Sequence, residues 1–364
     1  YEPPAGQSLM QTIIDIFPSN PITPLANASM LQVIVISLLV GFGILLADGL
    51  INAYAPRLAG KLQVSATVIK LIPLILMAVA GTITGLSNGL TVEAFTAASA
   101  QIASQGSGLM GAIVAFAFAY EGWIIATSIN SELHNAKKNL PLALSLGALI
   151  VVVIYMAYFV GLTGSMSTAE MMAAGDMLPE KAFGNLFGPA AGTIVFVFIV
   201  ISCLGTTNGL MMGCARGAYS LGVRGEGIAP RFFARVDKKT DMATNSAWFG
   251  IIIALLWYSY WHFFFIHGMG PSFFNWEPDE LPIITLYAGY IPMFISVMVH
   301  SKGSKPLMRY ILPVVAILGC CFMVYCAFVA YGIQALYYLG FFALVMAVGA
   351  LVRITQSRQK SKPE

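Results

Sequence analysis

The chain has 364 residues, of which 58% are apolar and only 10% are charged, and its net charge at pH 7 is +3. A soluble domain carries about 25% charged residues, so this composition excludes an ordinary soluble protein and indicates a chain embedded in a lipid bilayer. The few basic residues form no run with interleaved aromatic residues, and we therefore expect no nucleic-acid partner.

Apolar segments of the length that a bilayer requires, about 20 residues, recur along the whole chain. They predict an all-α membrane protein, a polytopic helical bundle of about nine transmembrane helices. The predicted spans are residues 30–47, 66–86, 109–128, 140–163, 189–213, 244–266, 281–299, 307–330 and 334–352.

Lysine and arginine are concentrated in every second connecting segment. The basic segments are 48–65, 129–139, 214–243, 300–306 and the C-terminal tail. Cytoplasmic loops of membrane proteins carry an excess of basic residues. The alternation therefore predicts a multi-pass protein of the cell (plasma) membrane with a cytoplasmic C-terminus, and it places residues 1–29 outside.

The span near residue 120 contains a carboxylate. Glu121 follows Phe118, Ala119 and Tyr120 and precedes Gly122 and Trp123. A charge at membrane depth is costly and usually faces a cavity, a partner or a transport pathway, and glycine gives the backbone the freedom to unwind. Broken helices near the midplane form the substrate sites of many secondary transporters. The alternatives are a structural acid bonded to a neighbouring helix and, for the aromatic residues, ordinary core packing.

Lys70 is the second ionisable residue within a predicted span. A buried lysine can titrate in a useful pH range, but Lys70 is about one turn from the predicted cytoplasmic edge and could extend its ammonium group to the lipid headgroups instead. The hydroxyls of Ser202, Thr206 and Thr207 could face it. Such small residues also occur at close contacts between membrane helices, so both interpretations stay open.

Other chemistry is not indicated. The five cysteines lie in or at the ends of apolar spans, with no paired spacing against histidine, which argues against disulfides and a metal site. No nucleotide-binding loop or Ser-His-Asp arrangement is recognisable. We expect neither an enzyme nor a bound cofactor.

Four stretches between residues 50 and 356 together resemble the amino acid–polyamine–organocation (APC) permeases. They are Asn52–Gln63 with residues 67–72, Phe118–Trp123 with Asn139–Pro141, Ser202–Gly209 with Arg216–Tyr219, and Gly225–Val236. The resemblance implies a partial leucine-transporter-type fold containing helices five to twelve, and an amino acid substrate. It further implies a substrate or gate role for the break at residues 118–123, with Phe118 as the aromatic gate. Family members often have glycine or another small residue where this chain has Glu121, so the role of Glu121 is not implied by the resemblance. Lys70 would replace a sodium ion, which makes a proton a candidate coupling ion.

Residues 1–47 instead resemble the dicarboxylate/amino acid:cation symporters, through Ser19-Asn20-Pro21 and Leu25-Ala26-Asn27. The topology of those symporters would place residues 1–29 inside, against the alternation of basic loops, so the orientation of the first helix stays open. We therefore expect two regions. Residues 1–47 would form a symporter-like segment with one transmembrane helix, and residues 48–364 a permease-like domain of eight helices with a cytoplasmic tail. The first four permease helices would then be missing, so we expect an N-terminally truncated permease joined to this segment.

The predicted function is that of a secondary amino acid transporter. It would move an amino acid across the cytoplasmic membrane by proton coupling or exchange. Two alternatives remain open from the sequence. The first, which depends on residues 1–47, is a cation-coupled dicarboxylate or amino acid symporter. The second is a membrane protein that no longer transports.

Overall fold

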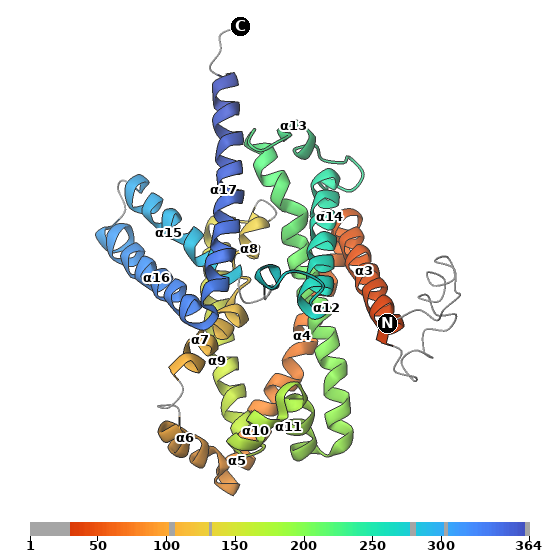
Figure 1. Ribbon diagram of the computed structural model, residues 1–364, viewed down its shortest axis with the longest axis vertical. Helices are drawn as coiled ribbons and strands as arrows, with labels where there is room; N and C mark the ends of the chain where they lie inside the picture. Colours follow the sequence, from red (N-terminus) through yellow and green to blue (C-terminus); the bar gives the residue numbers. More distant parts are fainter. Residues whose placement is uncertain (1–29, 102–105, 131–132, 277–281, 302–304, 361–364) are drawn as a thin grey trace.

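The computed structural model describes residues 30–101, 106–130, 133–276, 282–301 and 305–360. These residues are predominantly helical (Figure 1). Among them, nine helical segments are long and apolar enough to cross a bilayer, which confirms the predicted fold class. They are Ile34–Tyr54, Pro56–Asn88, Gly108–Ser128, Ala136–Thr163, Pro189–Val223, Thr244–Ile266, Pro282–His300, Leu307–Tyr331 and Ile333–Gln356.

The first predicted loop, residues 48–65, is wrong. Helix α3 (Met30–Tyr54) continues through the predicted join near residue 47, and α4 (Pro56–Leu76) begins after the single linking residue Ala55. Proline suits the first position of a helix, because its missing N–H would have had no partner there. Arg57 therefore lies in the first turn of a membrane helix and not in a long loop.

Two further helices also extend beyond their predicted bounds. Helix α9 (Ala136–Thr163) begins before the predicted start at residue 140, and α12 (Pro189–Val223) continues ten residues beyond the predicted end at residue 213. Polar residues near a membrane surface can remain helical, since the backbone bonds of a helix are satisfied within it.

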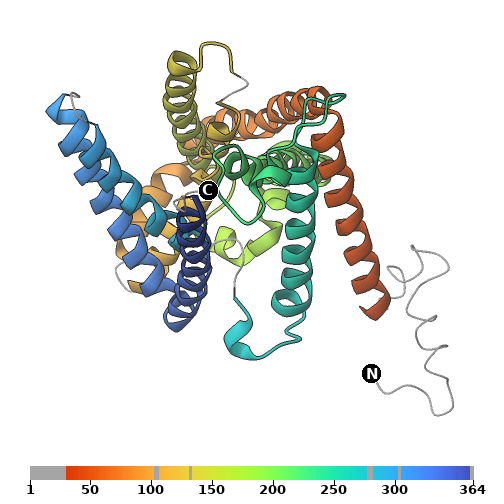
Figure 2. The same ribbon diagram turned by 90° about the horizontal axis from the view of Figure 1, so that it is seen from above.

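Helix α12 lies at the centre of one half of the bundle. It packs against α3, α4, α11 (Leu178–Phe187) and α14 (Thr244–Tyr260) (Figures 1 and 2). Small residues permit these close contacts. A Cβ added at Gly205 would lie 2.5 Å from the Cβ of Ala66 on α4, and one at Gly250 would lie 2.6 Å from the carbonyl oxygen of Cys214.

A buried amide connects three of these helices. Asn208 of α12, which is 3% exposed, donates from Nδ2 to the carbonyl oxygen of Ala59 at 3.0 Å and to Oε1 of Gln63 at 2.9 Å. Its Oδ1 accepts a hydrogen bond of 2.9 Å from Nδ2 of Asn52 on α3. The contacts fix the depth of α12 against both α3 and α4.

The other half of the bundle combines α7 (Gly106–Tyr120), α15 (Pro282–His300), α16 (Leu312–Tyr331) and α17 (Ile333–Lys360). Its buried core includes Val114, Ile284 and Cys326. In Figure 2, α15, α16 and α17 lie on the side of the bundle opposite α3.

Two of the basic segments lie at the same end of the molecule. The short helix α13 (Pro230–Phe233) and the C-terminal end of α17 lie toward one end of the molecule, whereas α5 (Thr82–Asn88), α6 (Leu90–Gln101) and α10 (Thr168–Ala174) lie at the other (Figure 1). The loop before α13 is joined to α17 by a hydrogen bond from Gln356 to the carbonyl of Gly227. Segment 214–243 and the tail thus share one end, as the basic alternation requires. The orientation of this end in the cell remains a prediction.

The closest contact of α9 offers a test of the packing. A Cβ at Gly161 would lie 2.1 Å from the carbonyl oxygen of Met77, whereas one at Gly147, on the same helix, would meet nothing within 4 Å. Overpacking typically costs about 1–3 kcal/mol, and we expect Gly161→Ala to lose stability in this range. Gly147→Ala should be neutral or slightly stabilising, since alanine favours helix. Denaturation in detergent micelles measures both. Equal stability of the two variants would contradict the close backbone packing.

Candidate functional site

The span that contains Glu121 is interrupted, as the sequence predicted. Helix α7 ends at Tyr120, the backbone turns at residues 121–124, and the short helix α8 (Ile125–Ser128) follows. Gly122 has a φ of +113°, a backbone conformation that L side chains rarely adopt. Glycine at this position therefore permits the break.

Glu121 has a partner on a distant helix. The hydroxyl of Tyr290 on α15 donates a hydrogen bond of 2.9 Å to its Oε1. The ring of Trp123 lies beside the same tyrosine, with centroids 5.6 Å apart. Glu121 is half-buried. The contact fits the interpretation of a structural acid, but it satisfies only one carboxylate oxygen, so a binding role remains open.

A second tyrosine satisfies a backbone group freed by the break. Tyr155 of α9 donates to the carbonyl oxygen of Ala119 at 3.1 Å, and its ring packs edge-on against Tyr120 at 5.0 Å. Within a bilayer such carbonyls need a protein partner or a water-filled cavity. Phe118, the predicted gate, is 47% exposed. The break is thus held between α9 and α15.

The predicted coupling residues lie elsewhere, on α4 and α12. Lys70 is half-buried, and among the described residues it has no hydrogen bond or ion pair. The hydroxyls of Thr206 and Thr207 donate to their own helix, to the carbonyls of Ser202 at 2.9 Å and Cys203 at 3.0 Å. The structure therefore joins no hydroxyl of this set to Lys70, and the coupling role stays a prediction.

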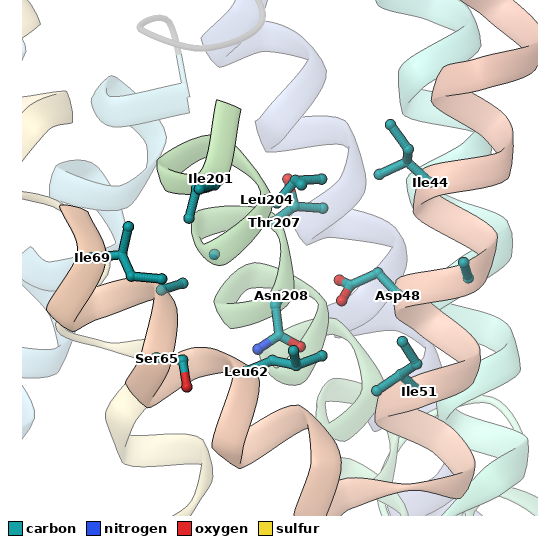
Figure 3. A pocket seen from close by; sticks show the side chains of 13 residues that line it. Ile44, Asp48, Ile51, Leu62, Ser65, Ile69, Ile201, Leu204, Thr207 and Asn208 are labelled. Carbon is teal, nitrogen blue, oxygen red and sulfur yellow. The ribbon is translucent and has the colours of Figure 1, made fainter. Parts of the chain in front are cut away.

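A cavity that was not predicted from the sequence lies between α3, α4 and α12. It has a volume of about 400 Å³ and is lined mainly by aliphatic side chains (Figure 3). Asp48 of α3 lies in its wall, together with Thr207 and Asn208 of α12. The sequence does contain a signal for this part of the helix. The residues after Asp48, through Tyr54, are largely apolar, which indicates a span that continues past the carboxylate.

A known protein family matches nearly the whole chain. The sequence model of the family described as "Amino acid permease" matches residues 3–352. The chain belongs to the amino acid permease family. The resemblance to APC permeases is thereby confirmed. The match includes residues 3–47, whose likeness to symporters stays a prediction.

Two relatives illustrate the similarity. The chain is 27% identical over 281 residues to the serine/threonine exchanger SteT of Bacillus subtilis (strain 168), a match that covers 75% of this chain and 60% of the relative. It is 26% identical over 214 residues to the b(0,+)-type amino acid transporter 1 of Homo sapiens, covering 56% of this chain and 41% of the relative. The chain thus spans less than two thirds of the length of either relative.

The bond between Tyr290 and Glu121 can be tested by deleting one hydroxyl. A hydrogen bond to a charged group contributes about 1.5–3 kcal/mol, so Tyr290→Phe should lower the free energy of unfolding by about this amount, measured by denaturation in detergent. The control is Tyr287→Phe on the same helix, because no hydrogen bond of the Tyr287 hydroxyl is found within the described part of the chain. An equal loss in both variants would contradict the bond.

Proposed function

We propose that this permease moves an amino acid across the cytoplasmic membrane, with the broken span at residues 118–124 forming part of the substrate site. The observation that carries the proposal is an acid held at a helix interruption at membrane depth. Family membership supports amino acid transport in general. The particular site rests on the geometry around Glu121.

Glu121 would receive the ammonium group of the substrate. Its Oε1 is engaged by Tyr290, which orients the carboxylate, and its second oxygen remains to accept a hydrogen bond. Charge-assisted hydrogen bonds of this kind are about twice as strong as neutral ones. The rings of Phe118 and Trp123, both partly exposed, would cover the substrate side chain.

The mode of coupling is a separate part of the proposal. The name of one relative describes an exchanger of serine and threonine, so these two amino acids are the first substrates to test. Exchange needs no coupling ion. If transport is instead driven by protons, Lys70 would be the residue that gains and loses the proton. It is a base in the span Pro56–Asn88, and it has no partner among the described residues.

Substitution of Glu121 tests the substrate site. Glu121→Gln keeps the shape but removes the charge, so the affinity for labelled serine or threonine in detergent should fall by about tenfold or more, as expected for the loss of one charged hydrogen bond. Glu93→Gln changes an exposed acid on α6 and should leave the affinity unchanged. Unchanged affinity in Glu121→Gln, accompanied by reduced stability, would show that the acid is only structural.

Lys70→Met tests proton coupling. Methionine keeps the apolar length of the side chain and removes the ammonium group. If Lys70 is the coupling residue, uptake into liposomes should lose its pH dependence while substrate binding persists. Lys61→Met, on the exposed N-terminal part of the same helix, should retain the pH response. The measurement is uptake against pH with and without sodium. An absolute sodium requirement, or an unchanged pH profile in Lys70→Met, would exclude this role.

A further inference from the structure

A second acid in a candidate membrane helix, Asp48, has no hydrogen-bond or ion-pair partner among the described residues. Neither of its carboxylate oxygens accepts a hydrogen bond from a described residue, and Oδ2 is completely buried. Figure 3 shows Asp48 on α3 across the cavity from the face of α12 that carries Leu204, Thr207 and Asn208. Asp48 as a whole is half-buried. A carboxylate oxygen that is buried without a partner is costly, and a ligand that donates a hydrogen bond to it would remove that cost.

Among the described residues, none of the other polar groups of the cavity hydrogen-bonds to Asp48. Ser65 also lines the cavity, but Figure 3 shows it on α4, on the opposite side of the cavity from Asp48. Both amide contacts of Asn208 are already made with Ala59 and Gln63, and the hydroxyl of Thr207 donates to the carbonyl of Cys203. No lysine, arginine or histidine is found among the described residues that line the cavity. None of the described residues supplies the positive charge or hydrogen-bond donor that Asp48 lacks, which leaves a place for a ligand.

The side chains that line the cavity limit the kind of hydrogen-bond donor that can bind there. Apart from Asp48, the cavity is lined chiefly by aliphatic side chains such as Ile44, Ile51 and Leu62. Hard metal ions require several oxygen ligands, and no group of three or more His, Cys, Asp or Glu side chains that could hold one is found among the described residues. An amino acid zwitterion would leave its own carboxylate without a cationic partner in an apolar surrounding. An organic ammonium ion with an apolar body satisfies Asp48 and the aliphatic wall together.

The opening of the cavity suits such a ligand. Ile44, Leu62 and Leu204, which line the cavity, are 40%, 42% and 44% exposed. These side chains belong to helices that are long and apolar enough to cross a bilayer, so the exposed rim lies at membrane depth. Alkylamines partition into bilayers with the charge near the headgroups and the chain in the lipid interior. They could therefore enter from the side.

From these observations we propose that the cavity between α3, α4 and α12 binds a lipophilic primary ammonium ion, held by the carboxylate of Asp48. This site is separate from the break at Glu121, whose contacts are with α9 and α15. Its ligand differs from an amino acid by lacking a carboxylate. Occupancy would join α3 more firmly to α12, because the ligand fills the space between them.

The test is binding of n-hexylammonium chloride to the purified chain in detergent, measured by calorimetry and by the shift of the unfolding temperature. Saturable binding is expected for the unsubstituted chain, with hexanol, the neutral isostere, binding much more weakly. Asp48→Asn should weaken hexylammonium binding by about tenfold or more, since one charged hydrogen bond is lost. Asp176 is an exposed acid outside the candidate membrane spans, so Asp176→Asn should leave the affinity for hexylammonium unchanged.

A second variant guards against misfolding of Asp48→Asn. Leu204→Trp keeps the carboxylate and fills part of the cavity, so it should also abolish saturable binding. Equal affinity of Asp48→Asn and the unsubstituted chain, equal affinity for hexanol and hexylammonium, or the absence of saturable binding would each overturn the proposal. None of these outcomes bears on serine binding at Glu121, which Glu121→Gln tests separately.

Discussion

The arrangement of α3, α4 and α12 depends on the side-chain amide of Asn208. In a bilayer an unpaired amide costs several kcal/mol, so its donors and acceptor strongly favour the one packing that satisfies them all. Asn208 meets that requirement with Asn52, Ala59 and Gln63. Gly205, one turn earlier, lets α12 approach α4 closely enough for these bonds to form. The cavity beside Asp48 is the space that this packing leaves.

Much of the architecture was predictable, because hydropathy reports directly on the bilayer. The spans and the break at Gly122 follow from residue type and spacing alone. The boundary at residue 48 was misplaced, because a single carboxylate outweighed the apolar residues that follow it through Tyr54. The partners of Asn208 and Glu121 were also invisible in sequence. Asn52 is 156 residues away from Asn208, and Tyr290 is 169 residues away from Glu121, so no local pattern connects them.

The two intramembrane acids illustrate how surroundings assign different chemistry to similar groups. Glu121 sits beside aromatic rings, and a tyrosine hydroxyl orients it at a place where the backbone is unwound. Asp48 sits on a continuous helix against aliphatic walls. A polar zwitterion with its own hydrogen-bonding groups suits the first surrounding. The second excludes such a molecule, since every additional polar group would lose its hydration without compensation.

The single residue Ala55 between α3 and α4 has a mechanical consequence. A linker of that length has no slack, so the C-terminal end of α3 cannot shift without carrying the start of α4 with it. About one turn from this linker, the amide of Asn208 ties the same two helices to α12 through Asn52 and Ala59. The linker and the amide hold neighbouring turns of the three helices together, whereas the cavity separates the helices farther along. A tilt of α12 would therefore move the linked ends of α3 and α4 with it, and a change in helix spacing would be confined to the part that surrounds the cavity.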